Sequence, residues 1–279
     1  MWKYKLGLGV GAYGGLTADE QIRLYARVGF DAFFTAWTPD APIAAWKKCG
    51  DECGLIYQSL HAPFQKANLM WTAGEAADAA VRELCDCLHA CADNGIGIMV
   101  AHAFIGFKEH TPNAYGVENF GRVAEMAARL GVTLALENTE GEEYLAALME
   151  AFEGRPEVKF CWDTGHELCY NHGADMMARY GGRLAATHLN DNLGISRFDG
   201  ETYWTDDLHL LPFDGIADWH SIAGRLDAAA FDGIMTFELT AKSKPDRHEN
   251  DGYAEMSAER YVTEAYKRAC RVAALRRYR

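Results

Sequence analysis

Eight short apolar runs, each typical of a buried strand, alternate along the chain with amphipathic helical patterns. Their residues are mostly β-branched, aromatic or small, as in Ile98-Met99-Val100, which favours strands buried on both faces. The runs lie at Tyr4–Val10, Phe30–Trp37, Leu55–His61, Ile96–His102, Thr133–Glu137, Val158–Asp163, Leu184–His188 and Ile234–Glu238. Strands that alternate with helices form parallel sheets with helical crossovers, so the pattern predicts an α/β fold.

Helical patterns fill most of the intervals between these runs. Thr17-Ala18-Asp19-Glu20 predicts a capped helix start, and Gly29 predicts its end. Further patterns lie at Glu75–Asp93, Asn113–Leu130, Gly141–Phe152, Ile216–Ala228 and Glu255–Leu275. Eight strand–helix units without a Pro/Gly/Ser-rich linker predict a closed (β/α)₈ TIM barrel in which residues 1–279 form a single domain. A doubly wound open sheet is the alternative.

The composition narrows the classes of partner. The chain has 279 residues, with 27 Lys and Arg against 40 Asp and Glu, which gives a formal charge of −13. This acidic balance argues against a nucleic-acid partner. No apolar stretch has the length of a membrane span or of a signal peptide, so we expect a cytoplasmic protein with no membrane contact. The sequence leaves a homo-oligomer open.

One glycine-rich segment resembles a dinucleotide-binding loop. Gly9-Val10-Gly11-Ala12-Tyr13-Gly14 matches G-x-G-x-x-G after a predicted strand. The helix that such a loop should open is predicted to start only near Thr17, and no acid ends the second strand. We therefore expect a tight loop at the barrel mouth and no nucleotide cofactor.

Metal-capable side chains end six of the eight strand-like runs. They are His61, His102, Glu137, Asp163, His188 and Glu238. An unpaired carboxylate is costly inside a strand, but several become tolerable where they share a cation. A barrel gathers the carboxyl ends of its strands on one face, so these side chains are expected to converge. The mixed oxygen and nitrogen ligands suit Mn²⁺, Mg²⁺, Co²⁺ or Zn²⁺.

The neighbours of these residues support the same site. Small side chains precede four of them by two positions and would leave room beneath a metal: Ala135, Cys161, Ala186 and Thr236. Further candidate ligands follow the strands at His166 and in the pair Asp207 and His209. Residues 190–192, Asn-Asp-Asn, are expected to orient His188.

These motifs resemble the xylose-isomerase-like TIM-barrel superfamily, from about residue 55 to 240. The resemblance rests on His61-Ala62-Pro63-Phe64, Leu136-Glu137-Asn138-Thr139, Trp162-Asp163-Thr164-Gly165-His166, His188-Leu189-Asn190-Asp191, Asp207-Leu208-His209 and Phe237-Glu238-Leu239. That superfamily contains sugar-phosphate isomerases and epimerases as well as apurinic-site endonucleases of the endonuclease IV type. The resemblance is specific for the superfamily and open as to the reaction.

The two branches imply different metal contents. Similarity to the ketose 3-epimerases implies one metal held by Glu137, Asp163, His188 and Glu238, with the glutamates as acid and base and His166 on the substrate. Similarity to the endonucleases implies three zinc ions and nine ligands, and all nine positions have a matching residue here. The nine are His61, His102, Glu137, Asp163, His166, His188, Asp207, His209 and Glu238.

The acidic composition favours the sugar branch. We expect a metal-dependent sugar or sugar-phosphate isomerase or epimerase that abstracts a proton beside a carbonyl through a metal-stabilised enediolate. His61, His102 and Arg197 are further candidates for substrate binding. A keto-polyol dehydratase on the same site and an endonuclease IV-like nuclease remain the alternatives.

Overall fold

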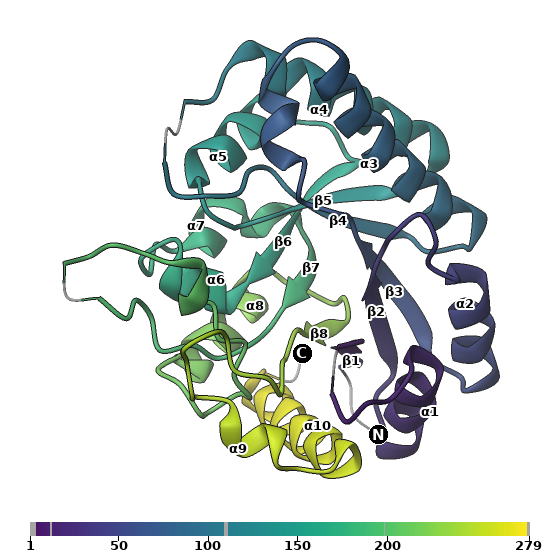
Figure 1. Ribbon diagram of the computed structural model, residues 1–279, viewed down its shortest axis with the longest axis vertical. Helices are drawn as coiled ribbons and strands as arrows, with labels where there is room; N and C mark the ends of the chain where they lie inside the picture. The colour runs from purple at the N-terminus through teal and green to yellow at the C-terminus, as the bar shows by residue number, and fades with distance from the viewer. Residues whose placement is uncertain (1–3, 12, 109–110, 198, 278–279) are drawn as a thin grey trace.

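The strands form a ring of eight parallel members in the computed structural model, which describes residues 4–11, 13–108, 111–197 and 199–277 (Figure 1). They are β1 (Leu6–Gly9), β2 (Ala32–Ala36), β3 (Ile56–His61), β4 (Ile98–His102), β5 (Thr133–Glu137), β6 (Val158–Asp163), β7 (Leu184–His188) and β8 (Met235–Phe237). Neighbours pair in sequence order, and β8 pairs with β1. The Leu189 amide donates to the Thr236 carbonyl at 2.9 Å and joins β7 to β8. The TIM barrel expected from the sequence is confirmed.

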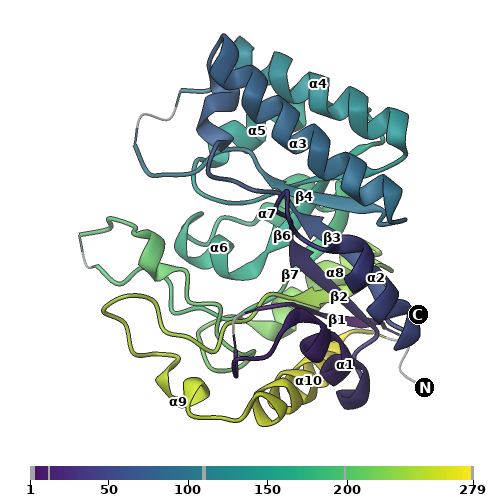
Figure 2. The ribbon, with the colours of Figure 1, turned by 45° about the vertical axis from the view of Figure 1, so that its right-hand side comes forward.

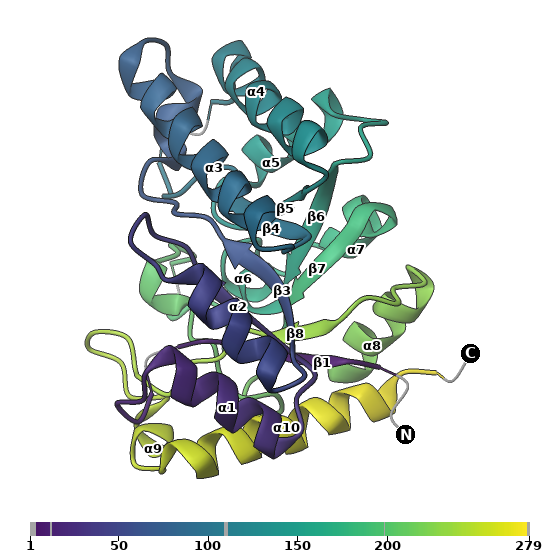
Figure 3. The same cartoon turned by 90° about the vertical axis from the view of Figure 1, so that its right-hand side faces the viewer.

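Helices surround this ring. They are α1 (Ala18–Val28), α2 (Ile43–Glu52), α3 (Glu75–Asp93), α4 (Ala114–Leu130), α5 (Glu142–Ala151), α6 (Thr164–Cys169), α7 (Met176–Tyr180), α8 (Trp219–Ala228), α9 (Asp251–Ala254) and α10 (Ala258–Leu275). Short 3₁₀ turns lie at Ala67–Trp71, Gly181–Arg183 and Trp204–Asp206. The last long helix, α10, runs beside α1, where Tyr266 packs edge-on against Phe30 (Figure 3).

The N-termini of α1 and α2 show why one helix start was predicted from the sequence and the other was not. Thr17 and Glu20 form the expected capping box of α1, with the Thr17 amide donating to Glu20 at 2.8 Å. The amide of Gly11 in the glycine-rich loop donates to the Gln21 side chain of α1, so the loop is tied to the fold. Helix α2 was not predicted, because its N-cap, Pro42, offers no side-chain cap to signal its start.

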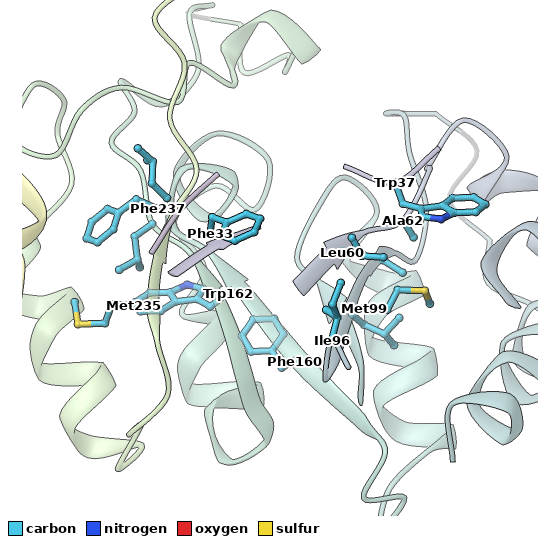
Figure 4. Close-up of a cluster of buried hydrophobic side chains, with 14 of the residues drawn as sticks. Phe33, Trp37, Leu60, Ala62, Ile96, Met99, Phe160, Trp162, Met235 and Phe237 are labelled. Carbon is cyan, nitrogen blue, oxygen red and sulfur yellow. The ribbon is translucent and has the colours of Figure 1, made fainter. Parts of the chain in front are cut away.

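Alternate residues of the strands build two separate apolar layers. On β6, Phe160 and Trp162 join the large cluster between strands and helices (Figure 4). Cys161 belongs instead to a small inner cluster with Val100, Ala135 and Ala186, all of them fully buried. The period of two therefore directs Asp163, two residues after Cys161, to the inner side of the ring. Small side chains floor the barrel beneath the strand ends, as expected.

Long loops cover the carboxyl end of the barrel. The loops after β7 and β8 project on one side of the molecule, and the two termini lie on the other (Figure 2). In a TIM barrel the carboxyl-terminal face carries the functional groups. Within the described residues, no helix is both long and apolar enough to cross a membrane.

Candidate metal centre

The strand register brings the predicted ligands together. His102 pairs with Glu137 across β4 and β5, and Asp163 pairs with His188 across β6 and β7. Glu238 directly follows β8, and its amide donates to the Leu189 carbonyl at 3.2 Å. Because all these positions lie at the carboxyl ends of parallel strands, their side chains meet at one level of the barrel.

Four of these residues form the central group: Glu137, Asp163, His188 and Glu238. Each offers one ligand atom, and the four atoms lie within 4.8 Å of one another. Nδ1 of His188 lies 2.8 Å from Oε1 of Glu137 and 3.1 Å from Oε2 of Glu238. The side chain of Glu137 is completely buried, whereas that of Glu238 is 29% exposed. Glu238 is therefore the carboxylate of this pair that a bound molecule can reach.

Two further groups flank the central one. In the first, Nε2 of His61 and Nε2 of His102 each lie 3.2 Å from Oε2 of Glu137. In the second, Asp207 lies between two histidines, at 3.6 Å from Nε2 of His166 and 2.6 Å from Nε2 of His209. The structure thus brings all nine predicted ligands together in three adjacent groups, two of which share Glu137.

The histidine tautomers leave a place for a proton or a metal ion in these groups. Nδ1 of His61, of His166 and of His209 faces a backbone carbonyl, at 2.8, 3.0 and 3.1 Å respectively. A carbonyl oxygen only accepts, so each Nδ1 must carry the proton. In a neutral imidazole Nε2 then presents a lone pair, which here faces a carboxylate oxygen. Two acceptors in contact are unfavourable unless a proton or a metal ion lies between them.

The ionisation behaviour of the site agrees with this need. Burial opposes the charged form of Glu238, but the charge and hydrogen bond of His188 outweigh burial and lower the pKa of Glu238 to about 2. Burial also opposes the charged form of His209, yet Asp207 raises the pKa of His209 to about 9. For Asp163 burial dominates and raises the pKa to about 6. Carboxylates and imidazoles here compensate one another's charge, and a divalent ion would take over that role.

These observations fit a divalent metal. Carboxylate oxygens and imidazole nitrogens form the donor set. Histidines that bind a metal usually donate their other ring N–H to a carboxylate or a backbone carbonyl, as His61, His166 and His209 do here. Oδ1 of Asp207 is buried and has no hydrogen-bond partner within the described residues, although it lies 3.6 Å from Nε2 of His166. A cation at this position would satisfy both atoms.

Two asparagines hold Asp163 and were only partly foreseen. The side chain of Asn190 was expected to orient His188. It donates to Oδ2 of Asp163 at 2.9 Å and to the backbone carbonyl of His188 at 3.3 Å, so it holds the Asp163 side chain and the backbone of His188. Asn138 accepts from the Asp163 amide at 2.8 Å. Gly165 leaves space for Asn190, because a Cβ at this position would lie 2.0 Å from the Asn190 amide oxygen. Asp163 itself caps α6 by accepting from the His166 amide.

Asp191 supports the loop that carries Asp207 and His209. Its fully buried carboxylate accepts from the amides of Phe213 and Ala217 and from the indole of Trp219, at 2.8 to 2.9 Å. It thereby fixes the segment between β7 and α8. The sequence placed Asp191 near His188, but its partners lie more than twenty residues away along the chain.

We expect Asp191→Ala to lower the free energy of unfolding by about 3 kcal/mol, because buried donors would lose their acceptor. A thermal melt should show a fall in Tm of roughly 5–10 °C. Asp232→Ala is the matched control, because Asp232 is an exposed aspartate, and it should leave Tm unchanged. Equal Tm values for the two variants would show that Asp191 does not hold this loop.

Arg197 does not join the three groups. Its guanidinium donates to Asp199 at 3.0 Å and to the Tyr203 hydroxyl at 2.9 Å, both on the same exposed loop. Lys244, which sequence reasoning did not single out, lies closer to the centre. Its ammonium is 3.2 Å from Oδ2 of Asp207. Lys244 belongs to no recognisable sequence motif, so its contact with Asp207 is visible only in the folded structure.

The family follows from a comparison with known protein families. A model of the xylose isomerase-like TIM barrel family matches residues 22–261. The chain belongs to this family. A curated relative, the uncharacterized protein y4fM of Sinorhizobium fredii, is 35% identical to this chain over 107 residues. That match covers 38% of this chain and 31% of the relative, so the chain spans about a third of the curated protein that it matches.

Solved structures of two sugar 3-epimerases and of a zinc-binding protein have the same fold. A D-psicose 3-epimerase from Clostridium cellulolyticum H10, crystallised with D-tagatose, superposes with a TM-score of 0.75 at 17% identity, over 96% of this chain and 99% of the other. The IOLI protein with a bound zinc atom gives 0.74 at 16%, over 97% and 98%. An L-ribulose 3-epimerase gives 0.72 at 15%, over 97% and 95%. At these identities the likeness concerns the fold.

Proposed function

We propose that this chain is a divalent-metal-dependent sugar isomerase or epimerase. The observation that carries the proposal is the pair of carboxylates, Glu137 and Glu238, which meet at His188 Nδ1 in a buried centre with one of them open to a cavity. Proton transfer at carbon beside a carbonyl needs such a positioned base, and a cation beside the base assists it by polarising the carbonyl. The epimerases among the structural neighbours support the same reaction class.

Glu137, Asp163, His188 and Glu238 would hold the metal ion. When bound, a divalent ion supplies Lewis acidity that polarises a carbonyl and favours loss of the neighbouring proton. Glu238 is the residue that meets the substrate, because its carboxylate is partly exposed. Its low pKa keeps it ionised near neutral pH, so it can accept the proton from carbon.

Glu137 has a different part in this proposal. It is completely buried and lies 3.2 Å or less from Nε2 of His61, Nε2 of His102 and Nδ1 of His188. These contacts fix its position, so it either returns the proton on the opposite side or holds the geometry for Glu238. His166 is anchored through its Nδ1 to the Asn138 carbonyl, and its Nε2 lies 3.6 Å from Oδ1 of Asp207, next to the central group; in this proposal it would bind a substrate oxygen.

Uptake of solvent deuterium tests this proposal. The metal-loaded protein is incubated in deuterated water with neutral, phosphorylated and acidic ketoses, and mass spectrometry follows each sugar. We expect a gain of one mass unit in at least one ketose, together with its isomer or epimer. A protein that neither exchanges hydrogen in any ketose of the panel nor forms an isomer or epimer of one would overturn the proposal.

Cleavage of DNA at abasic sites is the second candidate, and one observation favours it. All nine residues that match the ligands of the endonuclease branch assemble in three groups. The formal charge of −13 argues against a DNA partner. Nicking of an abasic duplex, with about three zinc ions per chain, would establish the nuclease and overturn the isomerase.

A further inference from the structure

A cavity of about 420 Å³ lies beside the candidate metal centre. Glu238 and His209 line its inner side, and the Gly9–Gly11 segment and Phe34 line one wall. The ring of Phe34 stacks on that of His188, with centroids 4.7 Å apart. A molecule in this cavity would therefore contact the partly exposed carboxylate of Glu238 directly.

The opposite wall is the loop after β8, which carries two lysines, Lys242 and Lys244. Buried Asn250 fixes this loop by donating to the Thr240 carbonyl at 2.8 Å and the Leu208 carbonyl at 3.0 Å. The Lys242 amide donates to the Thr240 hydroxyl at 3.3 Å. The backbone that presents both lysines is thus anchored to the rest of the fold.

The two ammonium groups differ in their partners. That of Lys244 is 3.2 Å from Oδ2 of Asp207 and lies 5.5 Å from the centre of the Trp204 ring, so its charge is already compensated. That of Lys242 is exposed and makes no hydrogen bond or ion pair within the described part of the chain. Within the described residues, Lys242 therefore adds a positive charge without an ion-pair partner to the lining of the cavity.

We propose that this cavity binds an anionic group of the substrate, a phosphate ester or a carboxylate, through the ammonium of Lys242. The inference rests on the proposed function, since Glu238 at the inner end would act on the carbonyl end of the same molecule. The hydroxylated carbons of the sugar would lie between Glu238 and Lys242, along the wall that contains Phe34. Lys244 keeps Asp207 compensated. The substrate class is thus an anionic ketose.

Deuterium exchange on three matched substrates tests this assignment: a ketose, its terminal phosphate ester and its terminal carboxylic acid. We expect kcat/KM at least about tenfold higher for one anionic form than for the neutral ketose. The form with the higher value identifies phosphate or carboxylate as the natural group. Lys242→Ala should reduce that preference about tenfold by raising KM, and Lys242→Arg, which retains the charge, should restore most of it.

Lys48→Ala is the matched control, because Lys48 is an exposed lysine on α2 outside the cavity. It should leave the preference unchanged. Equal kcat/KM values for neutral and anionic forms, or a preference unaffected by Lys242→Ala, would overturn the anionic subsite while the isomerase proposal stands. No exchange with any of the three would overturn both.

Discussion

Replacing Glu238 by Gln is expected to lower the rate of proton exchange about 1,000-fold, because the amide cannot accept a proton from carbon. The substitution keeps the size of the side chain and its place beside His188. It removes the carboxylate that the cavity exposes, while Glu137 stays buried beneath it. The rate is measured as deuterium uptake by the best substrate at saturating metal.

A matched control separates chemistry from folding. Glu255→Gln makes the same substitution at an exposed site near α10 and should keep the full rate. Metal content and Tm are measured for both variants, so that a loss of metal is recognised. If Glu238→Gln retains metal and also retains the rate, the base must be another residue.

Removal of the metal is expected to have the second large effect. Four carboxylates, those of Glu137, Asp163, Asp207 and Glu238, lie in the three ligand groups. Without a divalent ion, protons on the histidines and, at Asp207, the ammonium of Lys244 compensate their charge within the described residues. A ligand at 100 times its dissociation constant stabilises the folded state by about 3 kcal/mol. Chelation should therefore abolish exchange and lower Tm by roughly 5 °C.

Readdition of single metals makes this test decisive. Mn²⁺, Co²⁺, Mg²⁺ and Zn²⁺ are added one at a time to the chelated protein, and both rate and Tm are followed. At least one ion should restore both quantities together. Full exchange by a protein stripped of metal would contradict a metal-dependent reaction.

The sequence predicted the barrel and its ligands because both depend on short patterns. The bounds of β5, β6 and β7 agree with the expected runs, since Glu137, Asp163 and His188 each end an apolar stretch abruptly. Convergence of the six strand-end residues followed from the parallel topology. His166, Asp207 and His209 lie past the strands, and the full set of nine was implied by the family resemblance. The runs predicted for β1 and β2 are longer than these strands at both ends, because apolar neighbours such as Val10 and Trp37 continue the pattern beyond the strand.

Contacts between distant segments could not be predicted in this way. Asp191 was placed beside His188 by sequence adjacency, but its partners belong to a loop that folds back over the barrel. Lys244 reaches Asp207 only because the loops after β7 and β8 meet. Arg197 was a candidate because it lies in the loop at residues 190–206. Its guanidinium instead donates to Asp199, two residues further along the same loop.

Nuclear magnetic resonance of the sugar after reaction in deuterated water tests the central proposal most directly. The metal-loaded protein should place one deuterium on the carbon beside the carbonyl, and chelation or Glu238→Gln should prevent it. A hydrogen at that carbon that never exchanges, across neutral, phosphorylated and acidic ketoses, would contradict proton abstraction by Glu238, on which the proposed mechanism rests.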